Sequence, residues 1–249
     1  GKKSILQKKI LIAFKILFSI SLLVIILKSL DFYRTIELLK DTNVFFFLLA
    51  ISILVLQIMI ATIRWKFVLD NFNYQLTFRS ILSFLWIGLF FNQALPSSIG
   101  GDAMRGYYLK RKGGSIKDAA IGVLIDRLFG LIGLVLLVLL ITPLLFLRLE
   151  SVNFHWELIL VIIGLLIILN LIIFFDSVRF NFLSSRIMSG FKSLAFESRR
   201  MLFSKHPGII LICLSVAIHI LSIFAVMFLS ISLALEIEFL GILLIIPLV

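Results

Sequence analysis

Residues 92–112 have the sequence NQALPSSIGGDAMRGYYLKRK, and this stretch decides the fold because it interrupts apolar sequence on both sides. Pro96 cannot continue the hydrogen-bond ladder of a helix, and Gly100 and Gly101 permit backbone dihedrals that other residues avoid. Backbone at membrane depth can leave the helix only where protein or a water-filled cavity satisfies its polar groups. The stretch therefore predicts a broken, re-entrant helix with a functional site at the break. A loop between two ordinary spans is the alternative.

The composition of the whole chain predicts an all-α polytopic membrane protein. Its 249 residues are 61% hydrophobic, and the mean hydropathy of +1.19 exceeds what a soluble domain needs. The net charge is +11, from 24 Lys and Arg against 13 Asp and Glu. Because the aromatic residues lie in apolar runs and not among these charges, topology and anionic lipid explain the basicity, and no nucleic-acid partner is expected.

Long apolar runs predict about five transmembrane helices, at residues 10–27, 44–63, 118–140, 158–175 and 207–229. The second span is expected to end at Arg64-Trp65-Lys66, a cationic and aromatic anchor at a membrane face. The third span is expected to be bounded by Pro143, which cannot continue the helix donor ladder.

A re-entrant hairpin over residues 80–112 is predicted between the second and third spans. The first helix, residues 80–91, would cover about 18 Å, well short of the hydrocarbon core of roughly 30 Å. A second short helix over residues 103–112 would return the chain to its starting side.

The charges of the connecting segments support the same hairpin independently. Lys and Arg are concentrated in the N-terminus and in residues 64–79, 105–117 and 179–205. The positive-inside rule places these segments, and the N-terminus, in the cytoplasm, so both flanks of the hairpin lie on one side. Residues 176–206 also carry apolar residues at helical spacing, which predicts a cytoplasmic amphipathic helix on the membrane surface.

An inverted repeat is a further possibility that the sequence raises. TFRSILS at residues 77–83 and EFLGILL at residues 238–244 each begin a helix after a span, but from opposite sides. Inverted repeats of this kind occur in many transporters. Because the chain stops inside an apolar segment, we expect residues 1–249 to be a single transmembrane domain that is incomplete at its C-terminus.

The predicted second half-helix begins near Gly101 and directs its free N–H groups and dipole toward the membrane interior. Such a helix start attracts an anion such as phosphate. Ser97 and Ser98 add hydroxyl donors, and the planar guanidinium of Arg105 suits phosphate or carboxylate. Asp102 is expected to cap the helix or to balance Arg105 at i+3; a purely local cap and pair is the structural alternative.

Asp126 and Arg127 lie within the third span, where ionisable side chains are costly and usually face a cavity or a partner. Our hypothesis is that Asp126 supports Arg105 or the re-entrant backbone, while Arg127 faces the anion. A buried structural ion pair is the alternative. The candidate lipid- and anion-binding residues are therefore Asn92, Ser97, Ser98, Gly100, Gly101, Asp102, Arg105, Asp126 and Arg127.

Other polar and small residues within the spans are interpreted as structural. Gln57 and His219 are expected to form interhelical hydrogen bonds, and Gly122, Gly130 and Gly133 are expected to permit close helix packing. The sequence contains no metal-ligand spacing, nucleophile elbow or phosphate-binding loop. We therefore predict no metal, cofactor or catalytic residue, and expect that the protein is not an enzyme.

Taken together, NxxLPSSIGGDxxRxYYL from Asn92, GGS from Gly113, Ala119-Ala120 and DRLxG from Asp126 resemble the transmembrane, flippase-like domain of lysylphosphatidylglycerol synthases. This domain also occurs as a stand-alone protein in bacteria and archaea. The motif is specific over residues 89–133, and the hydropathy layout agrees over nearly the whole chain.

The resemblance implies a translocase (flippase or scramblase) for anionic, aminoacylated or polyprenyl-linked phospholipids in a bacterial or archaeal cell (inner) membrane. The partner it implies is a membrane phospholipid with an anionic headgroup. The aminoacyl-transfer domain of the synthases is not in these residues, so that activity does not carry over. A membrane-embedded transferase on a lipid-linked substrate and a non-transporting accessory protein stay open as alternatives, as does a homodimer or a lipid-synthase partner.

Overall fold

The computed structural model describes residues 40–72, 74–94, 99–148, 185–204 and 206–245, with a few single positions before residue 25 and between 163 and 170. Every regular element in these ranges is an α-helix, which confirms the predicted all-α class. The expected spans at residues 10–27 and 158–175 lie largely outside the described residues.

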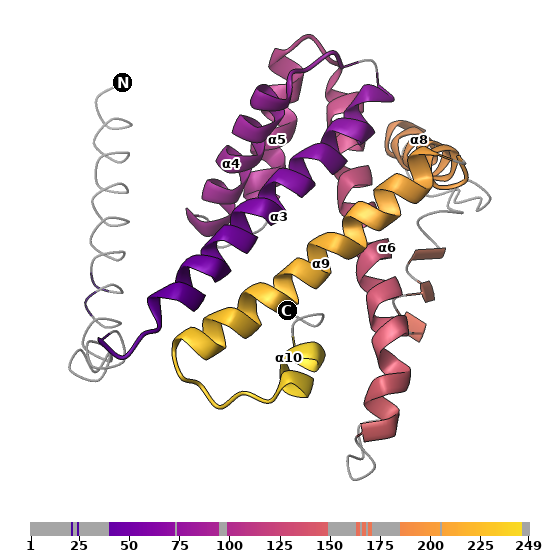
Figure 1. Cartoon of the computed structure of the whole chain (residues 1–249). Coiled ribbons are helices and arrows are strands. Elements are labelled where there is room, and N and C mark those ends of the chain that lie inside the picture. The colour runs from indigo at the N-terminus through magenta and orange to yellow at the C-terminus, as the bar shows by residue number, and fades with distance from the viewer. Residues whose placement is uncertain are drawn as a thin grey trace.

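Three of the described helices are long and apolar enough to cross a membrane: α3 (Val44–Asp70), α6 (Ile116–Arg148) and α9 (Pro207–Ser232). Each is about 39 Å long or more, which exceeds a hydrocarbon core of roughly 30 Å. Helices α3 and α9 lie antiparallel (Figure 1), since the Asn43 N–H at the start of α3 donates to the Ser232 carbonyl at 2.9 Å. These three helices form the frame that holds the rest of the bundle.

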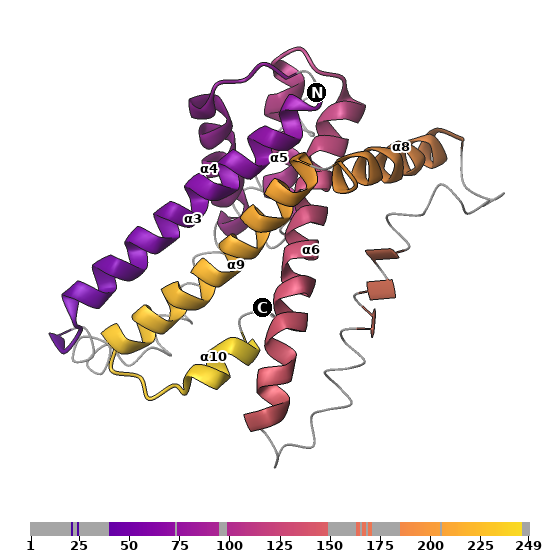
Figure 2. The same ribbon diagram turned by 45° about the vertical axis from the view of Figure 1, so that its right-hand side comes forward.

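Helices α4 (Phe78–Ala94) and α5 (Ile99–Arg111) form a hairpin beside the C-terminal half of α3 (Figure 1, Figure 2). The two ends of the hairpin meet, because the Tyr74 ring lies so close to Gly114 that a Cβ there would overlap the Tyr74 hydroxyl. The chain therefore returns to the place from which it left. The helices begin a few residues earlier than expected, and the turn at residues 95–98 lies outside the described residues.

Two helix ends differ from the predictions. Helix α3 continues to Asp70, and Arg64 and Trp65 are only 8% and 0% exposed, so the predicted anchor at a membrane face is wrong for these two residues. Arg64 can be buried on this helix because Asp126 balances its charge inside the bundle. Pro143 lies inside α6 and does not end it, since a proline removes only one helix hydrogen bond and packed membrane helices tolerate this loss.

Helices α8 (Ser185–Leu202) and α10 (Phe239–Ile245) pack against the frame. The buried residues of α8 recur at helical spacing, at Leu194, Ala195, Ser198 and Met201, and Figure 2 shows α8 extending from the bundle at a steep angle to α6. Part of the predicted amphipathic segment is therefore a helix with one buried face. Helix α10 follows α9 at the end of the α3–α9 pair opposite to that of α4, which is the arrangement an inverted repeat requires.

Candidate functional site

Asp126 on α6 joins three helices through its two carboxylate oxygens. Arg64 Nε from α3 lies 3.0 Å from Oδ1, and Arg105 Nη2 from α5 lies 2.7 Å from Oδ2. All three side chains are buried, with Asp126 only 3% exposed. Charge-assisted hydrogen bonds of this length are the strong ones. The expected pairing of Asp126 with Arg105 is therefore present, with Arg64 as a second partner.

Asp102 and Arg127 form the other half of the arrangement. Arg127 Nε and Nη2 lie 2.9 and 3.1 Å from the two carboxylate oxygens of Asp102, so the two residues form a bidentate ion pair. Asp102 Oδ1 also lies 3.4 Å from Arg105 Nη1, so it connects to the Asp126 half. The Arg127 side chain is 50% exposed and that of Asp102 24%. Asp126 and Arg127 do not pair with each other, because neighbours differ by about 100° around a helix.

Arg64, Asp102, Arg105, Asp126 and Arg127 together form one ion network. Three arginines stand against two aspartates, so the network carries one excess positive charge. The inner half at Asp126 is closed to solvent, whereas Arg127 reaches the surface of the bundle. The excess charge can therefore be met by an anion only at the Arg127 edge.

Aromatic and glycine contacts hold Arg105 in place. Its guanidinium carbon lies 3.9 Å from the centroid of the Trp65 ring, a cation–π contact. Gly88 of α4 allows this approach, since a Cβ there would lie 2.9 Å from Arg105 Cγ. Arg105 Nε is buried without a hydrogen-bond partner, so the position of the guanidinium depends on its two Nη groups and on the cation–π contact with Trp65.

The first turn of α5 is hydrogen-bonded to the end of α4. The Gly101 N–H donates to Asn92 Oδ1 at 2.9 Å, and a Cβ at Gly101 would overlap both the Asn92 side chain and the Gly88 carbonyl. The donor that the anion hypothesis assigned to a ligand at Gly101 is thus used within the hairpin. Gly100 lies in the first turn of α5. The predicted site residues Ser97 and Ser98 lie outside the described residues.

Arg64, Trp65 and Ser215 belong to the site although they are not among the residues predicted for it. Arg64 Nη1 donates to Ser215 Oγ of α9 at 3.1 Å, so the network touches all three long helices. A signal was present in the sequence, because Val68 and Leu69 follow Arg64 and Trp65 at helical spacing and indicate that α3 continues with an apolar face.

The interhelical roles predicted for the mid-span polar residues are confirmed. Gln57 Nε2 donates to Ser222 Oγ at 2.8 Å, and His219 Nε2 lies 3.0 Å from the Gly130 carbonyl oxygen. Gly133 lies against Ser215 so closely that a Cβ there would be 2.5 Å from Ser215 Cβ. Among the residues that the structure describes, no group of three His, Cys, Asp or Glu side chains could hold a metal ion.

Comparison with known proteins identifies the chain at the level of its family. The family described as "Lysylphosphatidylglycerol synthase TM region" matches residues 12–249. This chain belongs to that family. The residues of the hairpin and the ion network thus lie in the region that the family describes, and the resemblance noted in the sequence is confirmed.

Two archaeal membrane proteins are similar to this family member. The "UPF0104 membrane protein" of Pyrococcus horikoshii is 27% identical over 193 residues, which cover 76% of this chain and 56% of that protein. The protein of the same description from Methanocaldococcus jannaschii is 33% identical over 111 residues, covering 44% and 32%. The chain thus spans about half the length of the first relative and a third of the second. No solved structure matches the chain.

Proposed function

We propose that this family member is a lipid translocase, a flippase or scramblase that moves anionic, aminoacylated or polyprenyl-linked phospholipids between the leaflets of a bacterial or archaeal cell membrane. The observation that carries the proposal is the partly exposed pair of Arg127 with Asp102, at the edge of an ion network that has one arginine more than it has aspartates. Arg127 lies about 17 Å along α6 from Ile116, roughly half the thickness of the hydrocarbon core. A charge at that depth is costly unless it meets a partner; Asp102 is the partner in this structure, and a lipid phosphate would supply one in its place.

In the proposed cycle the lipid phosphate replaces Asp102 as the bidentate partner of the Arg127 guanidinium. The guanidinium geometry that binds the Asp102 carboxylate at two points suits a phosphate equally well. Asp102 keeps its contact with Arg105 at 3.4 Å when Arg127 leaves. The exchange therefore leaves no carboxylate unpaired, which keeps its barrier low.

The proposed movement is passive and involves no enzymatic chemistry. Asp126 is the only carboxylate in the inner half of the network, and it is held by two arginines. Protonating it would leave the buried Arg64 without a carboxylate partner and Arg105 with only the longer contact to Asp102, which argues against proton coupling through this group. In the proposed orientation the N-terminus and the base of the hairpin, with its basic residues Lys110, Arg111 and Lys112, face the cytoplasm.

The test is transport by the purified chain in proteoliposomes that contain a fluorescent anionic phospholipid, with a membrane-impermeant quencher outside. Removing Arg127 by Arg127→Gln deletes charge-assisted bonds worth about 1.5–3 kcal/mol, so we expect transport to slow about tenfold to hundredfold. Arg127→Lys should keep part of the rate. Arg200→Gln is the matched control, because Arg200 on α8 is also exposed and paired, with Glu197 at 3.5 Å.

The proposal is overturned if wild-type vesicles transport no faster than protein-free vesicles. It is also overturned if folded Arg127→Gln protein transports at the wild-type rate. Because Asp102 retains Arg105 as a partner, the Arg127 variant is expected to stay folded, and its thermal midpoint in detergent checks this.

A further inference from the structure

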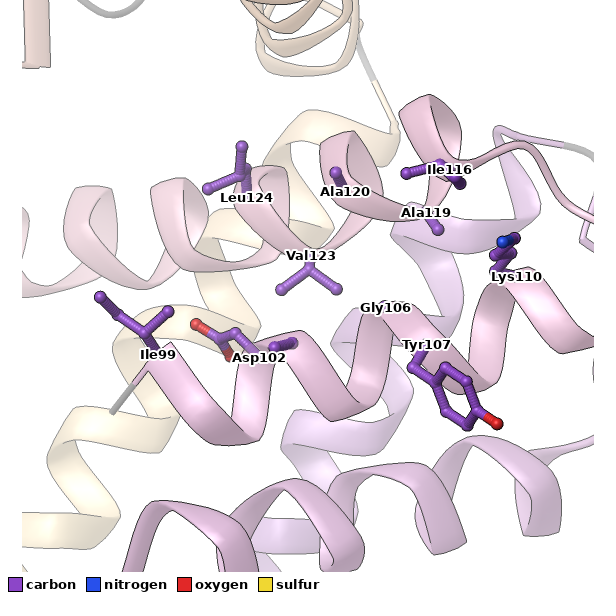
Figure 3. A pocket seen from close by; sticks show the side chains of 11 residues that line it. Ile99, Asp102, Gly106, Tyr107, Lys110, Ile116, Ala119, Ala120, Val123 and Leu124 are labelled. Atoms are coloured by element: carbon purple, nitrogen blue, oxygen red, sulfur yellow. The ribbon is translucent and has the colours of Figure 1, made fainter. Parts of the chain in front are cut away.

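A groove of about 400 Å³ lies between α5 and α6, and Asp102 is the one residue of the ion network that lines it (Figure 3). Its walls are almost entirely carbon, from Ala103 and Gly106 on α5 and from Ala120, Val123 and Leu124 on α6. The groove is open along one side, where Leu124 is 49% exposed. Its volume lies in the range of ligand-binding pockets, and its lining suits hydrocarbon.

The groove exists because small residues face one another across the two helices. A Cβ built at Gly106 would meet no atom within 4 Å, whereas one at Gly88 or Gly101 would collide with the neighbouring helix. Gly106 therefore does not serve close helix packing. The missing side chain of Gly106 leaves space in the wall of the groove, and helix packing does not account for this space.

The two ends of the groove differ in charge. Lys110 lies at the end beside Ala119 and the base of the hairpin, whereas Asp102, which binds Arg127, lies at the deeper end (Figure 3). Lys110 has no carboxylate partner among the residues that the structure describes. From Ile99 to Lys110 the groove follows α5 for about 17 Å, close to half of a hydrocarbon core of roughly 30 Å.

We infer that the α5–α6 groove binds one acyl chain of an anionic phospholipid from the leaflet at the hairpin base, with the lipid phosphate at Lys110. An apolar slot as long as one leaflet and open toward the bilayer fits an acyl chain. The unpaired ammonium at its outer end lies where a headgroup phosphate would be, since a lysine near a helix end extends to the interface. During transport the headgroup would then slide by about 12 Å from Lys110 to Asp102 and Arg127, and this step rests on the proposed function.

The test uses the full chain in vesicles that contain a small fraction of phosphatidylglycerol with a photoreactive group in its acyl chain. After illumination, mass spectrometry locates the lipid adducts. We expect adducts at the α5 and α6 residues of the groove at about tenfold the density found on the exposed apolar face of α3, such as at Leu48 and Leu54. Equal densities on the two surfaces would overturn the inference.

Gly106→Leu fills the groove without a clash in the bundle, and we expect it to remove groove adducts by about tenfold. Gly190→Leu on α8 is the matched control, because a Cβ there also meets no atom within 4 Å. Ala120→Leu fills the same groove from the opposite wall and serves if Gly106→Leu does not fold. Groove adducts that survive both substitutions at the wild-type density would overturn the inference.

Lys110→Gln tests the headgroup end of the groove. With phosphatidylglycerol and phosphatidylcholine probes compared side by side, the wild type should favour the anionic lipid by about fivefold, and the variant should lose this preference while keeping the acyl-chain adducts. An unchanged preference in Lys110→Gln would refute the assignment of the phosphate to Lys110.

The transport assay separates this inference from the proposed function. Wild-type protein that shows groove adducts but no transport would overturn the translocase proposal and leave the groove assignment standing. Wild-type protein that transports lipid at a rate unaffected by Gly106→Leu would overturn the path through the groove and leave the proposed function standing.

Discussion

Asp126→Asn is the substitution that most directly tests whether the ion network holds the helices together. The asparagine keeps the size of the side chain but leaves Arg64 and Arg105 without their shared negative charge. Removing one partner from a buried ion pair costs about 3–5 kcal/mol. Arg64 retains the hydroxyl of Ser215, and Arg105 retains Trp65 and the weaker contact with Asp102, so the cost should stay within this range although two arginines are affected.

For a chain of this size, a loss of about 3–5 kcal/mol lowers the thermal midpoint by roughly 6–20 °C. The assay is thermal unfolding of the purified protein in detergent, with the same lipid and salt for each variant. Asp70→Asn is the matched control, because the Asp70 carboxylate pairs with Lys66 at 2.7 Å but both side chains are exposed, at 46% and 36%. An exposed i,i+4 pair contributes about 0.5 kcal/mol or less, so this midpoint should change little.

Adding Arg64→Met to Asp126→Asn should recover part of the lost stability, because it removes the buried guanidinium that Asp126→Asn leaves without a carboxylate partner. A thermal midpoint for Asp126→Asn within about 2 °C of the wild type, or no lower than that of Asp70→Asn, would refute the reasoning. In that case the network would contribute nothing to the packing of the helices that carry it.

Two further predictions concern packing and pH. Gly133→Ala should destabilise the protein by about 1–3 kcal/mol because its methyl group collides with Ser215, whereas Gly106→Ala should be neutral or stabilising, and equal thermal midpoints would contradict the packing argument. Burial and the nearby Asp118 carboxylate raise the pKa of Tyr74 above its ordinary value of 10.0, so stability should fall as the pH rises above about 10, where the unfolded chain releases the proton first. Tyr74→Phe should reduce the fall of stability above about pH 10, measured as pH-dependent unfolding. At pH 7 the substitution should be neutral or slightly stabilising, because it removes a buried hydroxyl without a partner. An unchanged fall of stability in Tyr74→Phe would exclude Tyr74 as its source.

The hairpin could be predicted from the sequence because its evidence is local. Pro96, the short apolar runs and the charges of the flanking segments each depend on residues close in the chain. The end of α3 could not be predicted in the same way. A cationic and aromatic group after an apolar run is typical of a membrane face. Only the burial of Arg64 and Trp65, with the contact between Arg64 and Asp126 62 positions apart, shows that these two residues are internal.

The same limit applies to the candidate site. Asp126 and Arg127 could be singled out because charged residues within a span are rare and costly. The pairing of Asp126 with Arg105 could be predicted as well, but the contacts of Asp126 with Arg64 and of Arg127 with Asp102 could not, since each carboxylate had several arginines within plausible reach. The assignment to separate halves follows from the rotation of about 100° between neighbouring helical positions, which points Asp126 toward α3 and α5 and leaves Arg127 at the surface with Asp102.

The ion network has a buried half at Asp126 and a partly exposed pair of Asp102 with Arg127, and this difference decides where an anionic lipid can compete with the protein's own carboxylates. Both oxygens of Asp126 are occupied by buried arginines, and displacing either guanidinium would leave a buried charge unpaired at a cost of several kcal/mol, on the order of 3–5. Asp102 and Arg127 are partly exposed, so their pair is weaker and can be exchanged. Asp102 also lines the deep end of the α5–α6 groove. A lipid whose acyl chain lies in that groove would therefore meet Asp102 and Arg127, the one pair of the network that can open. The buried pairs of Asp126 would hold the helices in place while the lipid phosphate replaces Asp102.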